Sequence, residues 1–348
     1  MTNTNEKYEF ALDTFGDLAL DDEGKLMSYA ESIRLVVKEA ILADRLGIDA
    51  IALGEHHRDD FAISSPEMVL AGIASKTKNI KLASGVTVLS SDEPVRVFER
   101  FSTLDAISNG RAQVILGRGS FTESFPLFGF NLTDYEELFN EKLDLFSKLL
   151  TEKPVTWNGQ LRASLHNADV FPKTESGKLD TMIGVGGSPN SVVRAAAYNL
   201  PVVFAIIGGS PDRFKAYTTL YRRAAEQYGN PIYPVAVHSP GFVAETDEEA
   251  RELAFPNFKK QMDRIGKERG WTPMTKERFM NEVEHGSYYI GSPETVAKKI
   301  ANTLQILDAR RFDMVYGFGT FPAVARLKNI ELYGKEVIPR VKEILKGQ

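Results

Sequence analysis

The chain has 348 residues, a formal net charge of −5 at pH 7 and a composition that is 43% hydrophobic and 26% charged. These proportions are those of a soluble globular protein, and the absence of cysteine excludes disulfide bonds, thiolate metal sites and cysteine nucleophiles. The negative charge and the lack of any block of Lys or Arg argue against a surface that binds nucleic acid.

The N-terminal residues and the apolar runs indicate where the protein works. The first residues lack the basic and apolar regions of a signal peptide. No apolar run has the length that is needed to cross a bilayer. We therefore expect a cytoplasmic protein that makes no contact with a membrane.

Short β-rich runs alternate with runs of helical period, which predicts repeated βα units around a parallel sheet. In the first part of the chain the predicted strands are Tyr8–Asp13, Asp49–Leu53, Ile80–Leu89 and Ala112–Leu116. The predicted helices are Ser28–Leu46, Pro66–Lys76 and one that begins at Pro94 and ends at Asn109-Gly110. Ile80–Leu89 is apolar on both faces, as buried parallel strands are.

The alternation breaks after the fourth strand. Thr133 and Glu136 have the spacing of a capping box, which predicts the start of a helix. Trp157-Asn158-Gly159-Gln160 is typical of a hairpin turn. We interpret this stretch as an insertion over one mouth of a barrel.

The alternation then resumes to the end of the chain. The later predicted strands are Thr181–Val185, Pro201–Ile207, Val235–Val243 and Asp313–Phe318, and Pro322–Lys346 is predicted as a closing helix. Asp247–His285 is long, charged and helical, and we interpret it as a lid after the seventh strand. Eight strands favour an α/β fold of the TIM (β/α)8 type, formed as a single domain by residues 1–348.

Working groups of such barrels lie at the C-terminal ends of the strands. This rule selects Glu55-His56-His57 after the second strand, Gly85-Val86 in the third, Arg118 after the fourth and Gly186-Gly187-Ser188 after the fifth. Five phenylalanines near the same mouth are consistent with an apolar pocket, although core packing explains them equally well: Phe15, Phe61, Phe121, Phe125 and Phe318.

The paired histidines have three interpretations. Adjacent side chains on an extended segment point in opposite directions, so His56 and His57 are poorly placed to bind one metal ion. The other histidines, His166, His238 and His285, have no ligand-like spacing, and we expect no metal site. The remaining possibilities are a structural hydrogen bond under the barrel rim and an imidazole that faces a ligand.

Two glycine-containing segments are ambiguous on their own. Gly85 inside a strand indicates a bulge, the close approach of a flat ligand, or simple packing against a helix. Gly186-Gly187-Ser188 can present backbone N–H groups to a phosphate at a helix start, and Arg118 is suited to the matching charge. However, Gly-Ser-Pro recurs at Gly209 and Gly291, and Ser before Pro is also an ordinary helix opening.

Taken in order, these segments resemble the bacterial luciferase-like flavin monooxygenase family, most strongly from about residue 50 to residue 130. The resemblance is carried by Glu55-His56-His57, Ser84–Leu89, Pro94-Val95-Arg96, Leu104–Arg111, Gly117-Arg118-Gly119, Phe128-Gly129 and the block from Gly186 to Pro201. It implies a TIM-type barrel that binds FMN, or its deazaflavin relative F420, at the C-terminal mouth.

The resemblance also assigns roles to individual residues. It implies a non-proline cis peptide at Gly85–Val86 against the flavin ring, and it makes His56 the acid or base beside the reactive face. The cofactor-binding residues that it implies are Gly85, Val86, Arg118, Gly119, Ser120, Gly186, Gly187 and Ser188. The segment Phe255–Tyr289 falls where the family carries a mobile lid.

The activity implied by the resemblance is oxygenation of a small organic substrate by O2 and reduced FMN, which a separate reductase supplies. F420-dependent hydride transfer and a non-catalytic flavin-binding barrel remain as alternatives. Light-emitting relatives carry a cysteine at the position of Gly117, so light emission is not expected. By analogy with the family we expect a homodimer formed through Pro66–Lys76 and Val95–Ile107.

Overall fold

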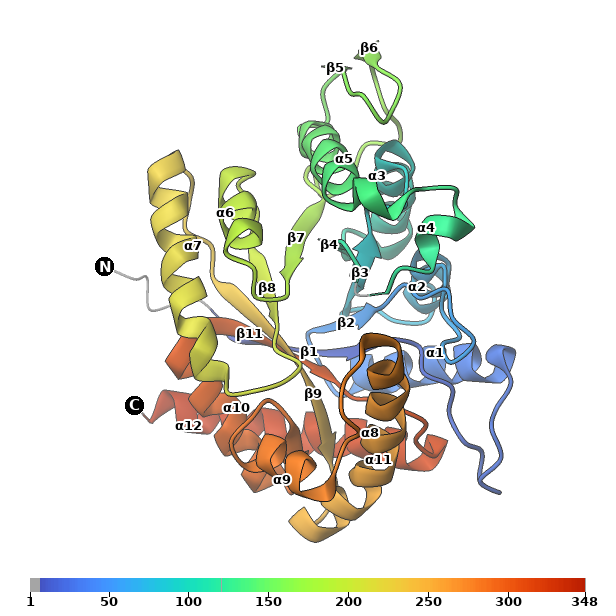
Figure 1. The fold of residues 1–348 in the computed structure, drawn as a ribbon, viewed down its shortest axis with the longest axis vertical. Helices are drawn as coiled ribbons and strands as arrows, with labels where there is room; N and C mark the ends of the chain where they lie inside the picture. Colours follow the sequence, from blue (N-terminus) through green and yellow to red (C-terminus); the bar gives the residue numbers. More distant parts are fainter. Residues whose placement is uncertain (1–6, 120, 348) are drawn as a thin grey trace.

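The computed structural model describes residues 7–119 and 121–347. In this part of the chain eight parallel strands close into a barrel that helices surround (Figure 1). The order around the barrel is β1, β2, β3, β4, β7, β8, β9 and β11, and the ring closes because β11 pairs with β1. The predicted TIM (β/α)8 barrel is therefore confirmed.

The barrel strands are β1 (Glu9–Thr14), β2 (Ala50–Leu53), β3 (Lys81–Val88), β4 (Ala112–Gly117), β7 (Asp180–Val185), β8 (Val202–Ala205), β9 (Val235–Val243) and β11 (Ala309–Val315). The helices that follow the strands are α1 (Tyr29–Arg45), α2 (Pro66–Ala74), α3 (Pro94–Ser108), α6 (Pro189–Ala197), α7 (Lys215–Tyr228), α10 (Pro293–Leu307), α11 (Ala323–Leu332) and α12 (Ile338–Lys346). A 3-10 turn, Pro211–Phe214, precedes α7, and a π-helical turn, Tyr333–Val337, joins α11 to α12.

Local sequence signals fix the ends of these helices. The hydroxyl of Ser28 accepts a hydrogen bond from the Glu31 N–H, and the Glu31 carboxylate accepts one from the Ser28 N–H, which is a complete capping box at the start of α1. Gly47 follows this helix with a φ of +71°, a left-handed conformation that glycine adopts without a steric cost. In α3, Pro94 occupies the first turn and Asn109 ends the helix in the left-handed region.

Residues between β4 and β7 form the predicted insertion, but its details differ from the prediction. It contains α4 (Ser124–Leu127), a 3-10 turn (Leu132–Asp134), α5 (Tyr135–Leu149) and the antiparallel hairpin of β5 (Val155–Trp157) and β6 (Leu165–Ala168). The hairpin loop spans residues 158–164 and is longer than the predicted turn. Glu141 of α5 accepts hydrogen bonds from the N–H groups of Gln160 and Leu161 in this loop.

The capping box predicted at Thr133 is wrong. The α-helix begins two residues later, after the 3-10 turn, and the Glu136 carboxylate is bound by two arginines instead of a backbone N–H. The eighth strand is also shifted, since β11 begins at Ala309 and ends at Val315. The start of β11 contains Arg311, which faces into the barrel. A search for apolar runs misses this start because the arginine is charged.

The barrel interior is built from apolar residues on six neighbouring strands and from charged residues on the other two. The apolar layer consists of Ala52, Ala83, Ile115, Met182, Val203 and Ala236. β1 and β11 contribute Asp13, Arg311 and Asp313, all nearly inaccessible to solvent. Arg311 donates hydrogen bonds to both oxygens of Asp313 and to Oε1 of Gln113 on β4.

The segment after β9 forms a helical excursion before α10. It consists of α8 (Asp247–Arg269), α9 (Lys276–Glu284) and the short strand β10 (Tyr289–Gly291), which extends the sheet beside β9. The predicted single helical run is broken between residues 270 and 275, where Gly270 adopts a φ of +69°. Figure 1 shows α8 and α9 gathered on one side of the barrel and α5 with the β5–β6 hairpin on the other.

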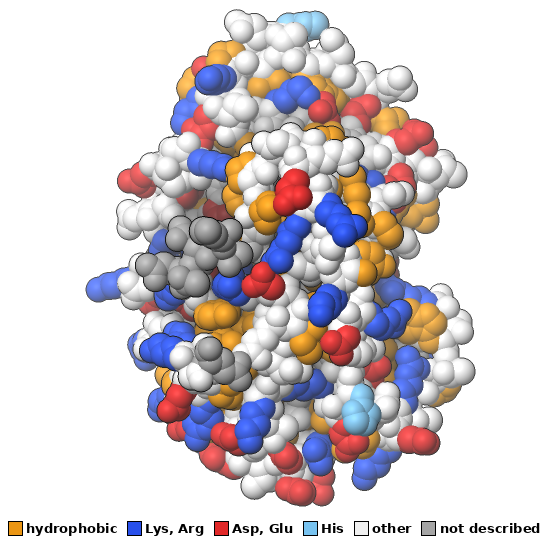
Figure 2. Space-filling view, turned by 90° about the vertical axis from the view of Figure 1, so that its left-hand side faces the viewer, with side chains coloured by type: hydrophobic (Ala, Val, Ile, Leu, Met, Phe, Trp, Pro, Cys, Tyr) orange, Lys and Arg blue, Asp and Glu red, His pale blue; other side chains and the backbone are white. Residues whose placement is uncertain are grey.

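The surface carries charges of both signs. Figure 2 shows acidic and basic side chains intermingled over one face, in agreement with the small net charge of −5. None of the helices in the described ranges combines the length and the apolar character that a membrane crossing requires.

Candidate active site

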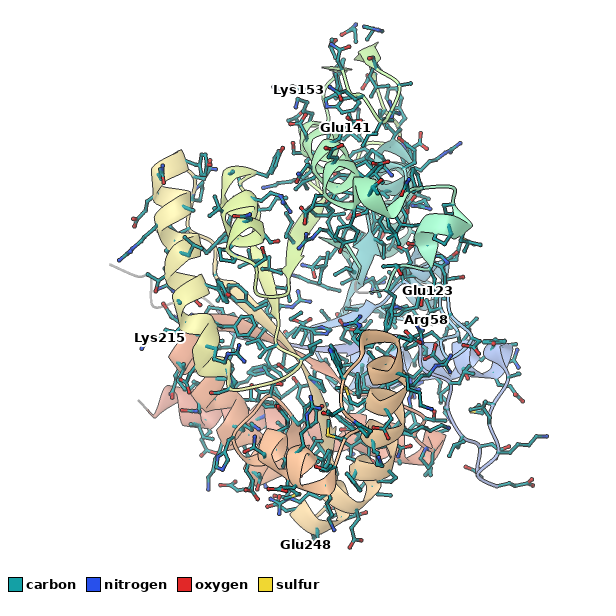
Figure 3. The ribbon with its side chains drawn as sticks, in the orientation of Figure 1. Arg58, Glu123, Glu141, Lys153, Lys215 and Glu248 are labelled. Carbon is teal, nitrogen blue, oxygen red and sulfur yellow. The ribbon has the colours of Figure 1, made fainter. Side chains whose placement is uncertain are left out.

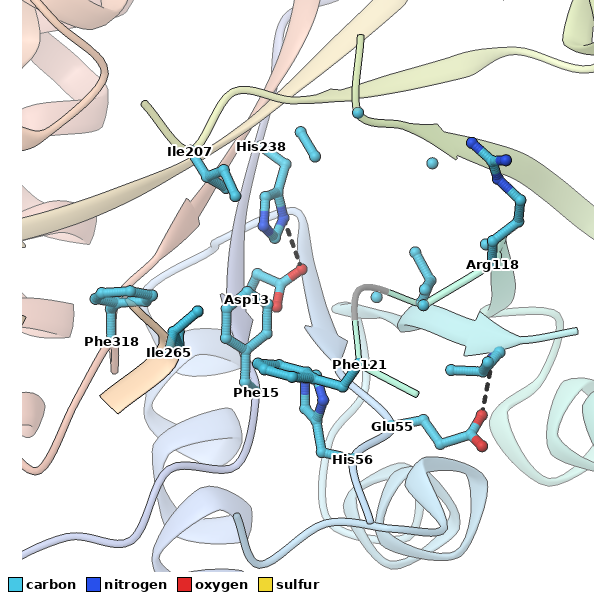
Figure 4. A pocket seen from close by; sticks show the side chains of 18 of the residues that line it. Asp13, Phe15, Glu55, His56, Arg118, Phe121, Ile207, His238, Ile265 and Phe318 are labelled. Carbon is cyan, nitrogen blue, oxygen red and sulfur yellow. Dashed lines mark hydrogen bonds and ion pairs between the residues drawn. The ribbon is translucent and has the colours of Figure 1, made fainter. Parts of the chain in front are cut away.

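A cavity of about 930 Å³ opens at the C-terminal ends of the barrel strands (Figure 4). Near the ends of four neighbouring strands the cavity is lined by Gly85, Gly117, Gly184 and Ala205. Because these residues carry at most one side-chain carbon, they leave the upper end of the barrel unfilled. The sequence thus makes room for a ligand where barrel enzymes place their active sites.

The peptide bond between Gly85 and Val86 is cis, as the resemblance implied. The Val86 side chain fits into a slot that two glycines form: a Cβ on Gly117 would lie 2.5 Å from Val86 Cγ2, and a Cβ on Gly184 would lie 2.9 Å from Cγ1. Real Cβ atoms do not approach so closely, so larger residues at these positions would displace Val86. The two glycines therefore define how the Gly85–Val86 peptide faces the cavity.

Both histidines line the cavity, but they have different neighbours. His56 lines the cavity, where its ring stacks on Phe61 at a centroid distance of 4.4 Å and meets Phe15 and Phe121 edge-on. Burial, the neighbouring His57 and the Arg58 cation all lower the pKa of His56, so its imidazole is neutral at pH 7. His56 is thus a neutral imidazole in an aromatic setting.

His57 and Glu55 have a structural role instead. Nε2 of His57 lies 3.0 Å from Oε1 of Glu55, and Oε2 of Glu55 accepts a hydrogen bond of 2.8 Å from the N–H of Val88. This chain of contacts fastens the loop after β2 to the end of β3. The contacts of His57 thus match the structural interpretation, although Glu55 and His57 also line the cavity beside His56.

The predicted lid covers the cavity. Its residues supply nine of the lining side chains, which are Gln261, Met262, Ile265, Arg269, Trp271, Thr272, Arg278, Glu282 and Tyr288. Four of the five phenylalanines predicted near the mouth also line the cavity, and the exception is Phe125, which is buried against Tyr135. The lining is therefore apolar and aromatic over much of its area.

Ion pairs tie the end of α8 to two loops of the barrel. Arg58, in the loop after β2, donates two hydrogen bonds of 2.7 Å to Glu268 of α8 and one of 2.6 Å to Glu123. Arg264 of α8 contacts Asp59 and Asp60 of the same loop. Figure 3 shows Arg58 and Glu123 beside each other at this junction. The lid is thus held closed by charged groups at its rim.

The start of α6 differs from the two other Gly-Ser-Pro segments. The hydroxyls of Ser210 and Ser292 each accept a hydrogen bond from a backbone N–H of their own helix, which is ordinary capping. The hydroxyl of Ser188 makes no such bond, so it stays available to a ligand. Gly186 lines the cavity, and Gly187 and Ser188 follow it just outside the lining. Gly187 has a φ of +101°.

Arg118 extends from the end of β4 to this helix start, at one end of the cavity (Figure 4). Its Nη2 lies 3.2 Å from the hydroxyl of Ser191 in the first turn of α6. Gly119 follows with a φ of +73° and accepts a hydrogen bond from the Tyr135 hydroxyl. Ser120 lies outside the described residues. An arginine, a hydroxyl and free backbone N–H groups at a helix start suit an anion such as a phosphate.

A carboxylate occupies part of this anion site. Glu136 binds Nη1 of Arg118 through one oxygen and Nη2 of Arg194 through the other, the latter at 3.1 Å. Sequence reasoning missed Ser191, Arg194 and Glu136. Ser191 and Arg194 lie within two turns of Ser188 on one helix, and this spacing was the signal that could have found them.

A family model for luciferase-like monooxygenases matches residues 14–309. The chain belongs to this family.

Relatives of this luciferase-like monooxygenase differ in sequence but share its fold. The alkanal monooxygenase alpha chain of Photorhabdus luminescens is 25% identical over 237 residues, which cover 68% of this chain and 65% of that protein. The oxygenating constituent of 3,6-diketocamphane monooxygenase from Pseudomonas putida, solved with FMN, has a TM-score of 0.77 at 22% identity and covers 96% of this chain and 99% of its own.

A third relative works with another cofactor. The coenzyme F420-dependent tetrahydromethanopterin reductase of Methanopyrus kandleri has a TM-score of 0.70 at 18% identity, over 97% of this chain and all of its own. These structural likenesses establish the barrel fold of this luciferase-like monooxygenase.

Two further cavity residues were missed because they lie inside strands. Asp13 of β1 and His238 of β9 both line the cavity and form an ion pair, with Nδ1 of His238 3.1 Å from Oδ2 of Asp13. His238 was set aside for lack of ligand-like spacing. The signal that could have found the pair is a charged or polar residue in the middle of an otherwise apolar strand.

Replacing Glu136 with glutamine should tighten FMN binding by this luciferase-like monooxygenase. The carboxylate would compete with a bound phosphate for Arg118 and Arg194, and exposed ion pairs contribute roughly 0.2–1 kcal/mol, which corresponds to about a 1.4- to fivefold gain. Titration of flavin fluorescence measures the change. Glu137→Gln, which removes the same charge from the next exposed residue, is the matched control. Equal affinities in the two variants would refute the competition.

Proposed function

We propose that this chain is a monooxygenase that uses O2 and reduced FMN, supplied by a separate reductase, to oxygenate a small organic substrate. The observation that carries the proposal is the shape of the cavity. It combines open space beside Gly85–Val86 with an anion site at Arg118 and the start of α6. FMN has a matching combination of a planar ring system and a terminal phosphate.

The residues present fit this cofactor. Gly117 and Gly184 accommodate the Val86 side chain, and Gly85, Val86, Gly117 and Gly184 all line the cavity, so a ring can approach the Gly85–Val86 peptide from the cavity. Arg118, Ser191 and the N–H groups after Gly187 suit the phosphate. When bound, reduced FMN supplies the electrons that O2 activation requires.

His56 is the candidate acid or base of the reaction. It lies in the cavity wall as a neutral imidazole, which can take up a proton at one ring nitrogen and release one from the other. The phenylalanines around it and the closed lid exclude water, which protects a reactive flavin from unproductive decay. The substrate is expected to enter between the lid and the aromatic wall.

The cofactor is tested by titration with FMN, riboflavin and F420, followed by the fluorescence of Trp271, which lines the cavity. Trp157 is buried in β5 and supplies a constant background. We expect FMN to bind more tightly than riboflavin, which lacks the phosphate. Tight binding of F420 and weak binding of FMN would support a hydride-transfer enzyme instead.

Replacing Arg118 with alanine should weaken FMN binding by roughly ten- to a hundredfold, since hydrogen bonds to charged groups contribute about 1.5–3 kcal/mol. Riboflavin affinity should stay nearly unchanged, because riboflavin has no phosphate for Arg118 to bind. The comparison of the two ligands separates a lost phosphate contact from a damaged barrel. An equal loss for both ligands would contradict the assignment of Arg118.

The reaction itself is tested with a flavin reductase, NADH, FMN and air against a panel of neutral apolar compounds. We expect oxygenated product that carries one atom from labelled O2. FMN binding without any oxygen-dependent turnover would support a non-catalytic flavin-binding barrel.

We further propose a homodimer formed through α2 and α3, which contact each other on one side of the barrel. These helices expose Met68 and Ile107, which are 71% and 48% accessible in the isolated chain. Light scattering of the purified chain over a wide concentration range tests this proposal, and a monomer throughout would overturn it.

A further inference from the structure

The Asp13–His238 pair lies in the cavity wall apart from the anion site (Figure 4). Phe15 separates it from His56, since the Phe15 ring is 5.2 Å from the His56 ring and 5.8 Å from the His238 ring, centroid to centroid. The imidazoles of His56 and His238 thus both contact Phe15. The proposed function uses only His56 and leaves His238 without a role.

Asp13 is placed behind the Gly85–Val86 peptide. A Cβ on Gly85 would lie 2.5 Å from Oδ2 of Asp13, so glycine is needed for the pair to exist. The Asp13 side chain is 1% accessible, and among the described residues its Oδ1 has no hydrogen-bond partner. A buried carboxylate is costly unless it is paired, which makes the bond to His238 its main compensation.

The other charged groups nearby are already engaged. Asp313 and Arg311 of β11 face the pair, but they bind each other, and Arg311 also binds Gln113. The Asp13–His238 pair is therefore a separate unit. Since the negative charge of Asp13 offsets the positive charge of His238, the protonated pair is neutral overall.

The proton shared by this pair determines whether Nε2 of His238 is a hydrogen-bond donor or an acceptor towards the cavity. If the proton is on the imidazole, both ring nitrogens carry hydrogen; if it is on the carboxyl, the neutral imidazole carries its hydrogen on Nε2. In both cases Nδ1 faces Asp13 and Nε2 keeps an N–H. Once the pair loses this proton, the one hydrogen left on the imidazole is on Nδ1, which donates it to Asp13. Nε2 then becomes an acceptor.

We propose that Nε2–H of His238 binds the acceptor oxygen of an uncharged, otherwise apolar substrate, and that Asp13 is the positioning residue that fixes the ring. This proposal builds on the monooxygenase function proposed above and names its substrate-orienting group. The surrounding wall fits such a substrate, because Phe15, Phe318, Ile207 and Ile265 line the same part of the cavity. A donor set among apolar side chains selects an oxygen and restricts its direction.

The proposal has a defined pH dependence. Burial lowers the pKa of His238, but the charge of Asp13 and its hydrogen bond outweigh this effect, so the pKa lies above its ordinary value of 6.5. The donor is therefore present below the pKa of the pair and is lost as the pH rises through it. Preference for an acceptor oxygen should disappear over the same pH range.

Two probes of equal shape test the donor: 2-adamantanone, which has an acceptor oxygen, and 2-methylideneadamantane, which has a methylene group in its place. Binding to the full chain is followed by Trp271 fluorescence, with and without FMN. We expect the wild-type protein to prefer the ketone by about tenfold, as one hydrogen bond to a charged donor allows. His238→Phe should bind both probes equally, and His238→Gln, which keeps an N–H donor, should recover part of the preference.

The control is His166→Phe, which removes an exposed histidine from β6 and should keep the full preference. If His238→Phe folds and still prefers the ketone, the proposal is wrong. Because the probes are also measured without flavin, failure of FMN to bind would contradict the proposed function and leave this measurement intact.

Wild-type protein provides a second measurement if the variants do not fold. The chain has five histidines, so the His238 ring signal in NMR spectra can be assigned by elimination, with single variants of the other four. The ketone should shift the His238 Nε2 resonance and the methylidene probe should not. Asp13→Asn should move the titration of His238 to lower pH. Equal shifts with both probes would overturn the proposal.

Discussion

Replacing His56 with asparagine should lower oxygenation turnover by roughly a hundredfold or more, the usual size of a general acid or base contribution. Asparagine keeps hydrogen-bonding groups of similar size, but it cannot take up and release a proton near neutral pH. FMN affinity should change little, because the phosphate site proposed at Arg118 is in another part of the cavity wall. Turnover of the best substrate from an aerobic screen and a parallel FMN titration measure both quantities.

The pH profile supplies an independent check on this residue. The pKa of His56 is lowered by burial, His57 and Arg58, so the free imidazole persists when the pH falls below 6.5. Wild-type turnover should therefore not decline between pH 8 and pH 6 because of this group, and protonation should reduce it only in more acidic solution. A loss of turnover centred near pH 6.5 would contradict a neutral, buried His56.

His57→Asn is the matched control for this experiment. It breaks the contact with Glu55 that fastens the loop after β2 to Val88, and a single net hydrogen bond contributes about 0.5–1.5 kcal/mol. We expect lower stability towards urea and turnover close to that of the wild type. If the two variants lost turnover equally, the loop, and not the His56 imidazole, would be the cause.

The fold was predictable because its signals are local and repeated. Alternation of strand-like and helix-like runs identified all eight barrel strands, and the apolar outward faces of these strands marked the core. The resemblance located the cis peptide at Gly85–Val86. These features depend on residues that are close together in the sequence, which is why boundaries shifted by only a few residues in most elements.

The site residues that the sequence did not reveal are brought together by contacts between elements that are far apart in the sequence. Asp13 and His238 meet because β11 pairs with both β1 and β9, and no pattern within either strand reveals this register. All nine residues of β9 are buried, so apolar alternation does not show which side chains face the barrel interior. Glu136 was assigned to a cap for a similar reason, since its partners Arg118 and Arg194 come from other elements.

The same kind of distant contact holds the cavity rim together. Arg326 of α11 and Glu39 of α1 are completely buried, and they form two hydrogen bonds of 2.8 Å, Nε to Oε1 and Nη2 to Oε2. Tyr316 donates a third bond of 2.8 Å to Glu39, and Nη1 of Arg326 binds the carbonyl of Asp17. Asp17 in turn accepts the N–H of Gly319, next to the cavity residue Phe318.

Arg326→Met should therefore destabilise the protein by about 3–5 kcal/mol, the cost of leaving one member of a buried ion pair without its partner. Glu39→Leu combined with Arg326→Met should be less destabilised than Arg326→Met alone, because no buried carboxylate remains unpaired. Arg340→Met is the control, since its ion pair with Glu336 is exposed and should contribute less than about 1 kcal/mol. Urea unfolding of the three variants measures these differences. If the double variant were the least stable, the pair itself, and not the unpaired charge, would account for the loss.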